Sequence, residues 1–178
     1  DPFVARRKYW DLYEGAPECE PPDPVAYEDM DPHSQRLMDA CDWRALEITP
    51  DHIRRARQAY FANISYIDDK IGEILAVLDA TRQDAHIVFL SDHGELLGQH
   101  GLWFKMSFFE GSARVPLMIA AADMPAGRID TPVSSIDLAP TLAALAGISM
   151  AEVAPWTEGV NLVPVANGEA RGPVAMEY

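Results

Sequence analysis

A carboxylate and an imidazole stand side by side directly after an apolar segment. A continuous run rich in β-branched residues spans 86–90 (HIVFL), and Asp92, His93 and Gly94 follow it after one serine. Such a run is typical of a strand buried on both faces of a parallel sheet. In open α/β sheets ligands bind beyond the carboxyl ends of the strands, where an Asp and a His can hold one divalent cation. The alternative is an ordinary turn in which Asp92 accepts hydrogen bonds from backbone amides.

The glycine-punctuated segment that follows carries one cation among aromatic residues. Over 94–109, Lys105 is the sole Lys or Arg. Its ammonium, held near a metal, would neutralise an anionic oxygen, so the metal and the lysine together describe a site for an oxyanion. A surface lysine that packs its stem on the aromatics is the alternative. Glu110 and Arg114 flank the next apolar run, and we expect them to brace the loop through an ion pair.

The elements that must position these residues alternate between helical and strand-like patterns, which favours an α/β class. The run Thr49-Pro50-Asp51 supplies an N-cap, a proline at the first helical position and an acid in the first turn. We expect the helix that starts there to pack one face on a sheet. The other expected elements are a strand over 115–120 with its proline near the start, a helix from about 135 or 137 to 146, and a last strand over 173–177. The apolar stripe of the long helix consists of Ile53, Ala56, Tyr60, Ile64, Ile67, Ile71, Ile74 and Leu78.

The segment 14–50 is rich in proline and acidic residues and shows little periodicity. We expect a long irregular excursion there, which would either wall a substrate pocket or simply pack irregularly. Residues 50–147 would form a core of helix, strand, loop, strand and helix. The whole of 1–178 reads as one segment of a catalytic domain, because the chain has no initiator Met and ends without a recognisable tail.

Composition excludes some partners. The formal net charge is −14, from 28 acidic and 14 basic residues, which argues against nucleic acid and against an anionic membrane surface. No apolar run is long enough to span a bilayer. The cysteines, Cys19 and Cys41, are too few for a disulfide framework. Two ordinary thiols lead us to expect a reducing, cytoplasmic location.

Several motifs in order carry a family resemblance. The runs S-D-H-G, G-x-H-G-L-W-F-K-M and E-G-S-A-R-V-P-L-M-I, all within 91–119, resemble the second signature region of sulfatases and their phosphonate-hydrolase relatives in the alkaline-phosphatase superfamily. The form K-M-S-F-F-E-G-S-A-R is similar to that of choline-sulfatases. Further runs with counterparts in the family lie at 1–14, 31–36, 60–66 and 155–159.

The resemblance implies a fold and a set of site residues. The fold would be alkaline-phosphatase-like, with this chain forming part of a mostly parallel sheet flanked by helices. Asp92 and His93 would be metal ligands, and Lys105 would be the catalytic residue that contacts the sulfate group. His100 would lie just behind the ligands. The cofactor would be one divalent cation, either Ca²⁺ or the softer Mn²⁺.

The family's nucleophile is a formylglycine made from the cysteine of a C-x-P-x-R motif. The nearest match here begins at Cys19 but has Asp23 where the arginine belongs, and an acid there would repel an anionic substrate. We therefore reject Cys19 and expect the formylglycine in an N-terminal part of the protein that this chain lacks. The chain would hold half of a site.

The resulting functional expectation is a sulfuric ester hydrolase that converts choline-O-sulfate to choline and sulfate. Its partner would be a small-molecule sulfate ester, and it could form a homo-oligomer. One alternative is a phosphonate monoester or phosphodiester hydrolase of the same superfamily. Another is a catalytically inactive fragment with only a structural or metal-binding role.

Overall fold

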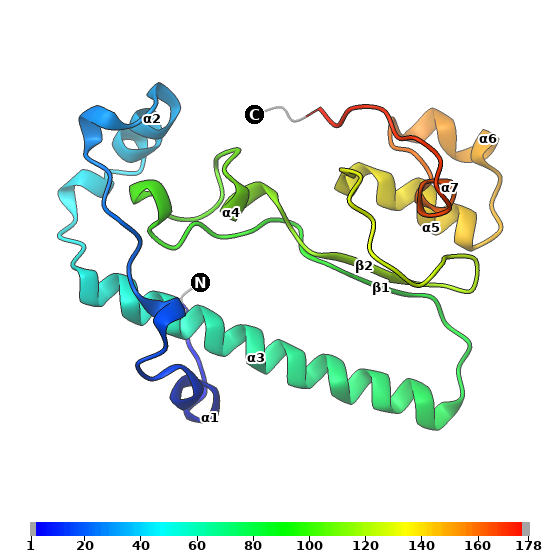
Figure 1. Cartoon of the computed structure of the whole chain (residues 1–178), viewed down its shortest axis with the longest axis horizontal. Coiled ribbons are helices and arrows are strands. Elements are labelled where there is room, and N and C mark those ends of the chain that lie inside the picture. Colours follow the sequence, from blue (N-terminus) through cyan, green and yellow to red (C-terminus); the bar gives the residue numbers. More distant parts are fainter. Residues whose placement is uncertain (1–2, 176–178) are drawn as a thin grey trace. The chain divides into compact units, whose positions relative to one another are not determined.

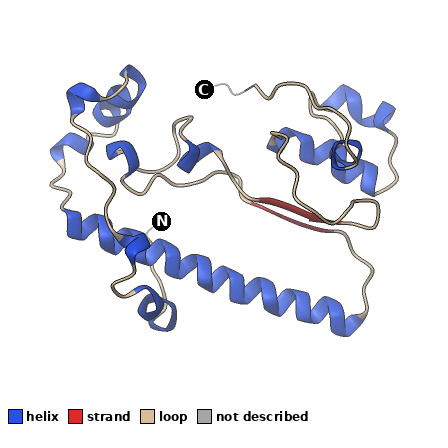
Figure 2. Cartoon of the chain, in the orientation of Figure 1, coloured by secondary structure: helices blue, strands red, loops and turns tan. Residues whose placement is uncertain are grey.

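The computed structural model describes residues 3–175 and divides the chain into two compact units. Unit 1 comprises the residues up to Gln83 together with His93–Arg114, and unit 2 comprises Asp84–Asp92 together with the residues from Val115 onward. Helices and loops make up most of both units, as Figure 2 shows. The candidate site loop therefore belongs to unit 1, although the strands on either side of it belong to unit 2.

Unit 1 is built on the long helix α3 (Pro50–Thr81), which runs uninterrupted over 32 residues (Figure 1). The predicted start is confirmed: the Thr49 hydroxyl accepts from the His52 amide at 3.2 Å, and His52 Nδ1 accepts from the Thr49 amide at 3.3 Å. Arg82, in the left-handed region with φ 50°, ends the helix. The short elements α1 (Arg7–Trp10), η1 (Asp11–Tyr13) and η2 (Pro17–Cys19) contact α3.

The apolar stripe of α3 is only partly covered within the described residues. Ile53, Ala56 and Tyr60 of the stripe are partly buried, whereas Ile67 and Ile74 are exposed. The fully buried residues of this helix, Gln58, Ala59 and Ala62, lie beside the predicted stripe. The contacts of α3 are made with α1, η1 and η2, all of unit 1. The expected packing of this helix face on a sheet therefore stays a prediction.

The segment 14–50 contains a helix that the sequence analysis missed. Helix α2 (Pro32–Ala40) begins after Asp31, whose carboxylate accepts from the amides of His33 at 2.9 Å and Ser34 at 3.1 Å. Asp31 followed by a proline is the same kind of start signal as that of α3. Besides η2, this segment contains the 3₁₀ helices η3 (Tyr27–Asp29) and η4 (Trp43–Ala45).

Unit 2 contains the strands β1 (Ile87–Leu90) and β2 (Leu117–Ala120). They pair antiparallel, with Leu90 opposite Leu117. The expectation of a parallel arrangement is thus not met between these strands, because no crossover helix links them and the chain folds back. Burial on both faces is not seen either, since Ile87 and Leu90 are partly exposed at 36% and 38%. Pro116 immediately precedes β2, as predicted.

The rest of unit 2 is helical. The predicted short helix is present as η6 (Ser135–Asp137) followed by α5 (Leu138–Leu145), and Gly147 follows it with φ 75°. Residues 173–175 form no strand, and the remainder of the last predicted strand lies outside the described residues. No helix in residues 3–175 combines the length and apolarity needed to cross a bilayer. The other helical elements are α6 (Met150–Val153), η7 (Ala154–Trp156) and α7 (Leu162–Ala166).

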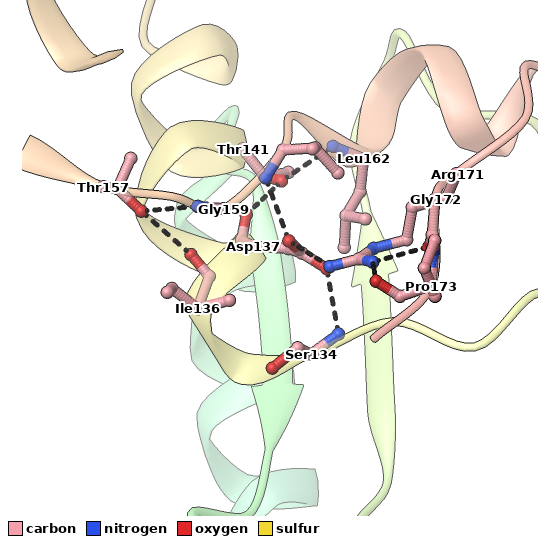
Figure 3. Close-up of polar contacts among 11 residues, drawn as sticks. Ser134, Ile136, Asp137, Thr141, Thr157, Gly159, Leu162, Arg171, Gly172 and Pro173 are labelled. Atoms are coloured by element: carbon pink, nitrogen blue, oxygen red, sulfur yellow. Dashed lines mark hydrogen bonds and ion pairs between the residues drawn. The ribbon is translucent and has the colours of Figure 1, made fainter. Parts of the chain in front are cut away.

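A buried carboxylate organises unit 2. Asp137 is fully buried and accepts hydrogen bonds from the amides of Ser134 and Val160, both at 2.9 Å. The guanidinium of Arg171 reaches the same carboxylate from the C-terminal segment (Figure 3). Thr141 extends the network, because its hydroxyl donates to the Asp137 carbonyl oxygen at 2.6 Å. Three separate segments of the chain, at 134–141, at Val160 and at Arg171, are thereby joined at Asp137.

Candidate metal and oxyanion site

The structure brings two of the predicted site residues together. His93 Nε2 lies 2.9 Å from Lys105 Nζ, and His93 Nδ1 lies 2.8 Å from the carbonyl oxygen of Gly94. An ammonium has only donors, so Nε2 is the acceptor in the first contact. Nδ1 consequently carries the proton and donates to Gly94. These two contacts favour the Nδ1–H tautomer of His93.

This tautomer suits a metal ligand. Metal-bound imidazoles usually donate their other ring N–H to a backbone carbonyl or a carboxylate, as His93 does to Gly94, and bind the ion through the remaining nitrogen. That nitrogen, Nε2, accepts from Lys105 here, so the ammonium would have to turn away for a metal ion to bind. Asp92, the preceding residue, adds a carboxylate, so the donor set fits Ca²⁺ or Mn²⁺ by type. Within residues 3–175 no group of three or more His, Cys, Asp or Glu side chains gathers to hold a metal ion. Asp92 and His93 would therefore supply only part of a coordination shell.

Lys105 returns to His93 because the intervening loop folds back on itself. The Leu96 amide donates to the Phe104 carbonyl, and the Gly98 amide to the Leu102 carbonyl, each at 2.9 Å. The Glu95 carboxylate adds a further link by accepting from the Phe104 amide at 2.6 Å. The tip turns through positive φ values at Gly98, His100 and Gly101.

The loop rests on its own apolar core. Leu96 and Leu102, which are 1% and 0% exposed, pack with Leu37 of α2 and with Trp43 of η4. Both partners come from the segment 14–50. This segment thus helps to support the loop that carries Lys105, which is a more definite role than the irregular packing considered above. Partly buried residues around this core are Met38, Cys41, Trp103, Met106 and Phe109.

The short helix α4 (Glu110–Ala113) lies against the backbone of both site segments. The Ser112 carbonyl accepts from the Gly94 amide at 2.7 Å, and the Ser112 hydroxyl donates to the carbonyl oxygen of Lys105. The approach is so close that a Cβ at Gly94 would clash with the Gly111 carbonyl oxygen. Only glycine fits at this point between His93 and the loop.

Two further contacts hold the chain just after Lys105. The Ser107 amide donates to the Lys105 carbonyl at 2.6 Å. His33 Nε2 lies 2.9 Å from the carbonyl oxygen of Met106, which links α2 to the loop. The backbone at 105–106 is therefore held by side chains from α4 and α2 and by a local turn at Ser107.

His100 lies at the tip of the loop, where its ring stacks on that of Phe109 with centroids 3.9 Å apart. A position just behind the metal ligands stays a prediction for this residue.

Glu110 and Arg114 form the predicted ion pair at 3.1 Å, but both side chains are largely exposed, so the pair adds little stability. Glu110 and Arg114, with His100 and Phe109, line an open cavity of about 740 Å³. The other residues that line it are Pro22, Asp23, Val25, Gln99 and Gly111.

Cys19 is the residue that imitates a nucleophile. Its side chain is 1% exposed, and burial raises the pKa of its thiol. A buried thiol with a raised pKa is a poor nucleophile. The environment of Cys19 therefore agrees with its rejection on sequence grounds.

The residues that sequence reasoning missed all act through the backbone. Ser112 and Glu95 bond to main-chain atoms of the loop, and His33 bonds to the Met106 carbonyl. The positions of these side chains in the sequence do not indicate which main-chain atoms they bond. For His33, the sequence did offer a signal: Asp31 and Pro32 indicate the start of a helix, and His33 follows them in its first turn.

Known proteins show the family to which this chain belongs. Residues 14–148 match the family model described as Sulfatase. The chain belongs to the sulfatase family. This sulfatase chain is 56% identical over 185 residues to the choline-sulfatase of Rhizobium meliloti (strain 1021), covering 100% of the chain and 36% of that protein. It is also 37% identical over 172 residues to mouse iduronate 2-sulfatase, covering 75% of the chain and 30% of that protein.

The fold of the sulfatase chain is shared with a solved enzyme. The phosphonate monoester hydrolase from Silicibacter pomeroyi superimposes with a TM-score of 0.81 and 29% identity, over 98% of this chain and 36% of that one. The fold is thus alkaline-phosphatase-like, as the resemblance implied. The chain spans only 30% to 36% of the length of these relatives.

Proposed function

We propose that the protein to which this chain belongs is a sulfuric ester hydrolase acting on choline-O-sulfate. The observation that carries the proposal is the contact between His93 Nε2 and Lys105 Nζ at the carboxyl end of β1. It joins a candidate metal ligand to the candidate sulfate-binding cation. The 56% identity to a choline-sulfatase supports the choice of substrate within the organic sulfates.

In this proposal Asp92 and His93 hold one divalent cation, Ca²⁺ or Mn²⁺. A bound cation would polarise an oxygen of the sulfate group. Lys105 binds a second sulfate oxygen and neutralises the charge that develops as the ester oxygen departs. Its ammonium already lies at the imidazole, so only the terminal side-chain atoms need to turn toward the substrate.

The nucleophile is proposed to be a formylglycine supplied by a part of the protein outside these 178 residues. The chain contains no C-x-P-x-R motif, and its nearest match at Cys19 is buried. On this view residues 1–178 carry part of the metal and sulfate site. We also propose that β1 and β2 belong to a larger, mostly parallel sheet, and that the enzyme is cytoplasmic, since Cys19 and Cys41 are both free thiols.

The test is sulfate release from choline-O-sulfate by the full-length protein, with Ca²⁺ or Mn²⁺ added. An aryl sulfate and a phosphonate monoester serve as comparison substrates. Preferential turnover of choline-O-sulfate would support the proposal. The phosphonate monoester is included because of the structural likeness to the Silicibacter enzyme, and faster turnover of this ester would replace the sulfatase proposal.

The 178-residue chain should be assayed beside the full-length protein. We expect metal binding without turnover from the chain alone, because it offers two metal ligands and no nucleophile. Turnover by the chain alone would overturn the half-site proposal. A full-length protein that binds metal but hydrolyses none of the three esters would leave only a structural or metal-binding role.

A further inference from the structure

We propose that Ser112 is a positioning residue that holds Lys105 against His93. This inference rests on the proposed function, because it assigns Ser112 a role in the site formed by those two residues. Ser112 bonds both segments of the site: its carbonyl accepts from the amide of Gly94 at 2.7 Å, and its hydroxyl donates to the carbonyl of Lys105. One residue thus ties the chain after His93 to the chain at Lys105.

The environment of Ser112 makes these bonds effective. The residue is 4% exposed, so water has little access to compete for its hydroxyl. Its amide donates to the Phe109 carbonyl at 2.9 Å, which holds Ser112 in the first turn of α4. A buried hydroxyl that is fully partnered fixes its neighbours more firmly than an exposed one.

The close packing of glycines shows how near α4 lies to the site backbone. A Cβ added at Gly94 would clash with the Gly111 carbonyl, and one added at Gly111 would clash with the Gln99 side chain. A side chain at either glycine would therefore push α4 away from the loop. Ser112 follows Gly111 directly, and the hydrogen bond from its hydroxyl to the Lys105 carbonyl connects this closely packed segment to Lys105.

Ser112 differs from the other residues that hold the same stretch. The Ser107 amide and the His33 ring bond carbonyls at 105 and 106, but neither contact reaches the chain beside His93. The Ser107 contact also uses a backbone N–H, which any residue except proline provides. Of these residues, Ser112 alone bonds both segments of the site.

The first test is kinetic and uses the full-length protein. Ser112→Ala should lower kcat for choline-O-sulfate on the order of 10- to 100-fold, because a misplaced catalytic group costs about that much. Ser112→Thr keeps the hydroxyl and should recover most of the rate. Ser107→Ala is the matched control: it removes a buried serine hydroxyl from the same loop while leaving the backbone N–H in place, and it should stay within about twofold of wild type.

A double-mutant cycle separates positioning from general support of the fold. If Ser112 acts through Lys105, then adding Ser112→Ala to Lys105→Ala should slow that variant by less than about twofold. A structural role would lower activity by the same factor in both backgrounds. Equal factors in the cycle, or full activity of Ser112→Ala, would overturn the inference.

A spectroscopic readout does not depend on turnover. The ring ¹⁵N shifts of His93, measured at one fixed pH in metal-free, ¹⁵N-histidine-labelled protein, report which nitrogen carries the proton. Ser112→Ala should weaken the preference for the Nδ1–H form, and Ser107→Ala should not. Unchanged His93 shifts in Ser112→Ala would overturn the inference even if the wild-type protein hydrolysed no ester, an outcome that would refute the proposed function separately.

Discussion

Lys105 Nζ lies 2.9 Å from His93 Nε2, although the two residues are twelve positions apart in the chain. This contact orients the imidazole and places a cation where an anionic oxygen would bind. It joins two residues that the sequence offered as separate candidates. Substitutions in the surrounding structure can show what each part contributes to the site and to stability.

Removal of the Lys105 ammonium should abolish most of the turnover. Lys105→Ala in the full-length protein is expected to lower kcat/KM for choline-O-sulfate by about 10²–10³-fold, the usual cost of losing one group that stabilises an oxyanion. Lys70→Ala is the control, because Lys70 is an exposed helix lysine paired with Glu73. Activity above a tenth of wild type in Lys105→Ala would remove this residue from the proposed mechanism.

Loss of either candidate ligand should weaken metal binding. Asp92→Ala and His93→Ala are each expected to reduce the affinity for Mn²⁺, measured by calorimetry, by at least about tenfold, and to abolish sulfate release. His86→Ala provides a matched histidine control at an exposed position before β1. Unchanged Mn²⁺ affinity in His93→Ala, with circular dichroism like that of wild type, would show that the metal binds elsewhere.

Two glycine-to-alanine changes should have opposite signs. Gly94→Ala forces a Cβ into the Gly111 carbonyl and is expected to lower the melting temperature, because backbone must move. Gly72→Ala lies within α3 with open space around it, and should stabilise the chain by about 0.5–1 kcal/mol. Thermal unfolding followed by circular dichroism compares the two directly. A neutral Gly94→Ala would contradict the close approach of α4.

The buried ion pair of unit 2 should dominate the stability of that unit. Arg171 Nε and Nη2 donate to the two carboxylate oxygens of Asp137, each at 2.9 Å, and both side chains are buried. Arg171→Leu leaves the carboxylate uncompensated and is expected to cost about 3–5 kcal/mol in urea unfolding. Arg128→Leu removes an exposed pair with Asp130 and should change stability by less than about 1 kcal/mol.

The same pair predicts a dependence of stability on pH. Burial, the largest influence, raises the pKa of Asp137, but the bonds from Arg171, Val160 and Ser134 outweigh it, so the pKa is lowered overall. The unfolded chain therefore takes up the proton first as the pH falls. The contribution of Asp137 is complete above its unfolded pKa of about 3.9 and is lost as the pH falls through the lower folded value. Urea unfolding between pH 6 and pH 3 should show a shallower decline in Arg171→Leu than in wild type.

Local signals predicted local structure well. The start of α3 followed from Thr49, Pro50 and Asp51, whose side chains and backbone set the first turn without help from distant residues. Helix α2 carries a similar signal at Asp31 and Pro32, but its short length and the prolines before it hid the pattern. The sequence could not predict that β1 and β2 pair antiparallel. An apolar run indicates a strand, but it does not indicate which strand lies next to it or in which direction.

The candidate site was predictable only in its residue types. Asp92, His93 and Lys105 could be named because a carboxylate, an imidazole and an ammonium at the end of a strand suggest one chemistry. Their geometry depends on hydrogen bonds between main-chain atoms, such as that between Gly94 and Ser112. Such bonds leave no residue pattern in the sequence, so the role inferred for Ser112 required coordinates.

The loop between β1 and β2 is closed twice, once where Leu90 faces Leu117 in the strand pair and again where the Gly94 amide meets the Ser112 carbonyl. Residues 98–101 form the tip of this loop and can therefore change in length without shifting either closure. Doubling such a segment costs only about 0.6 kcal/mol in closure entropy. A change at the tip would thus leave His93 and Lys105 in place, because both residues lie outside it.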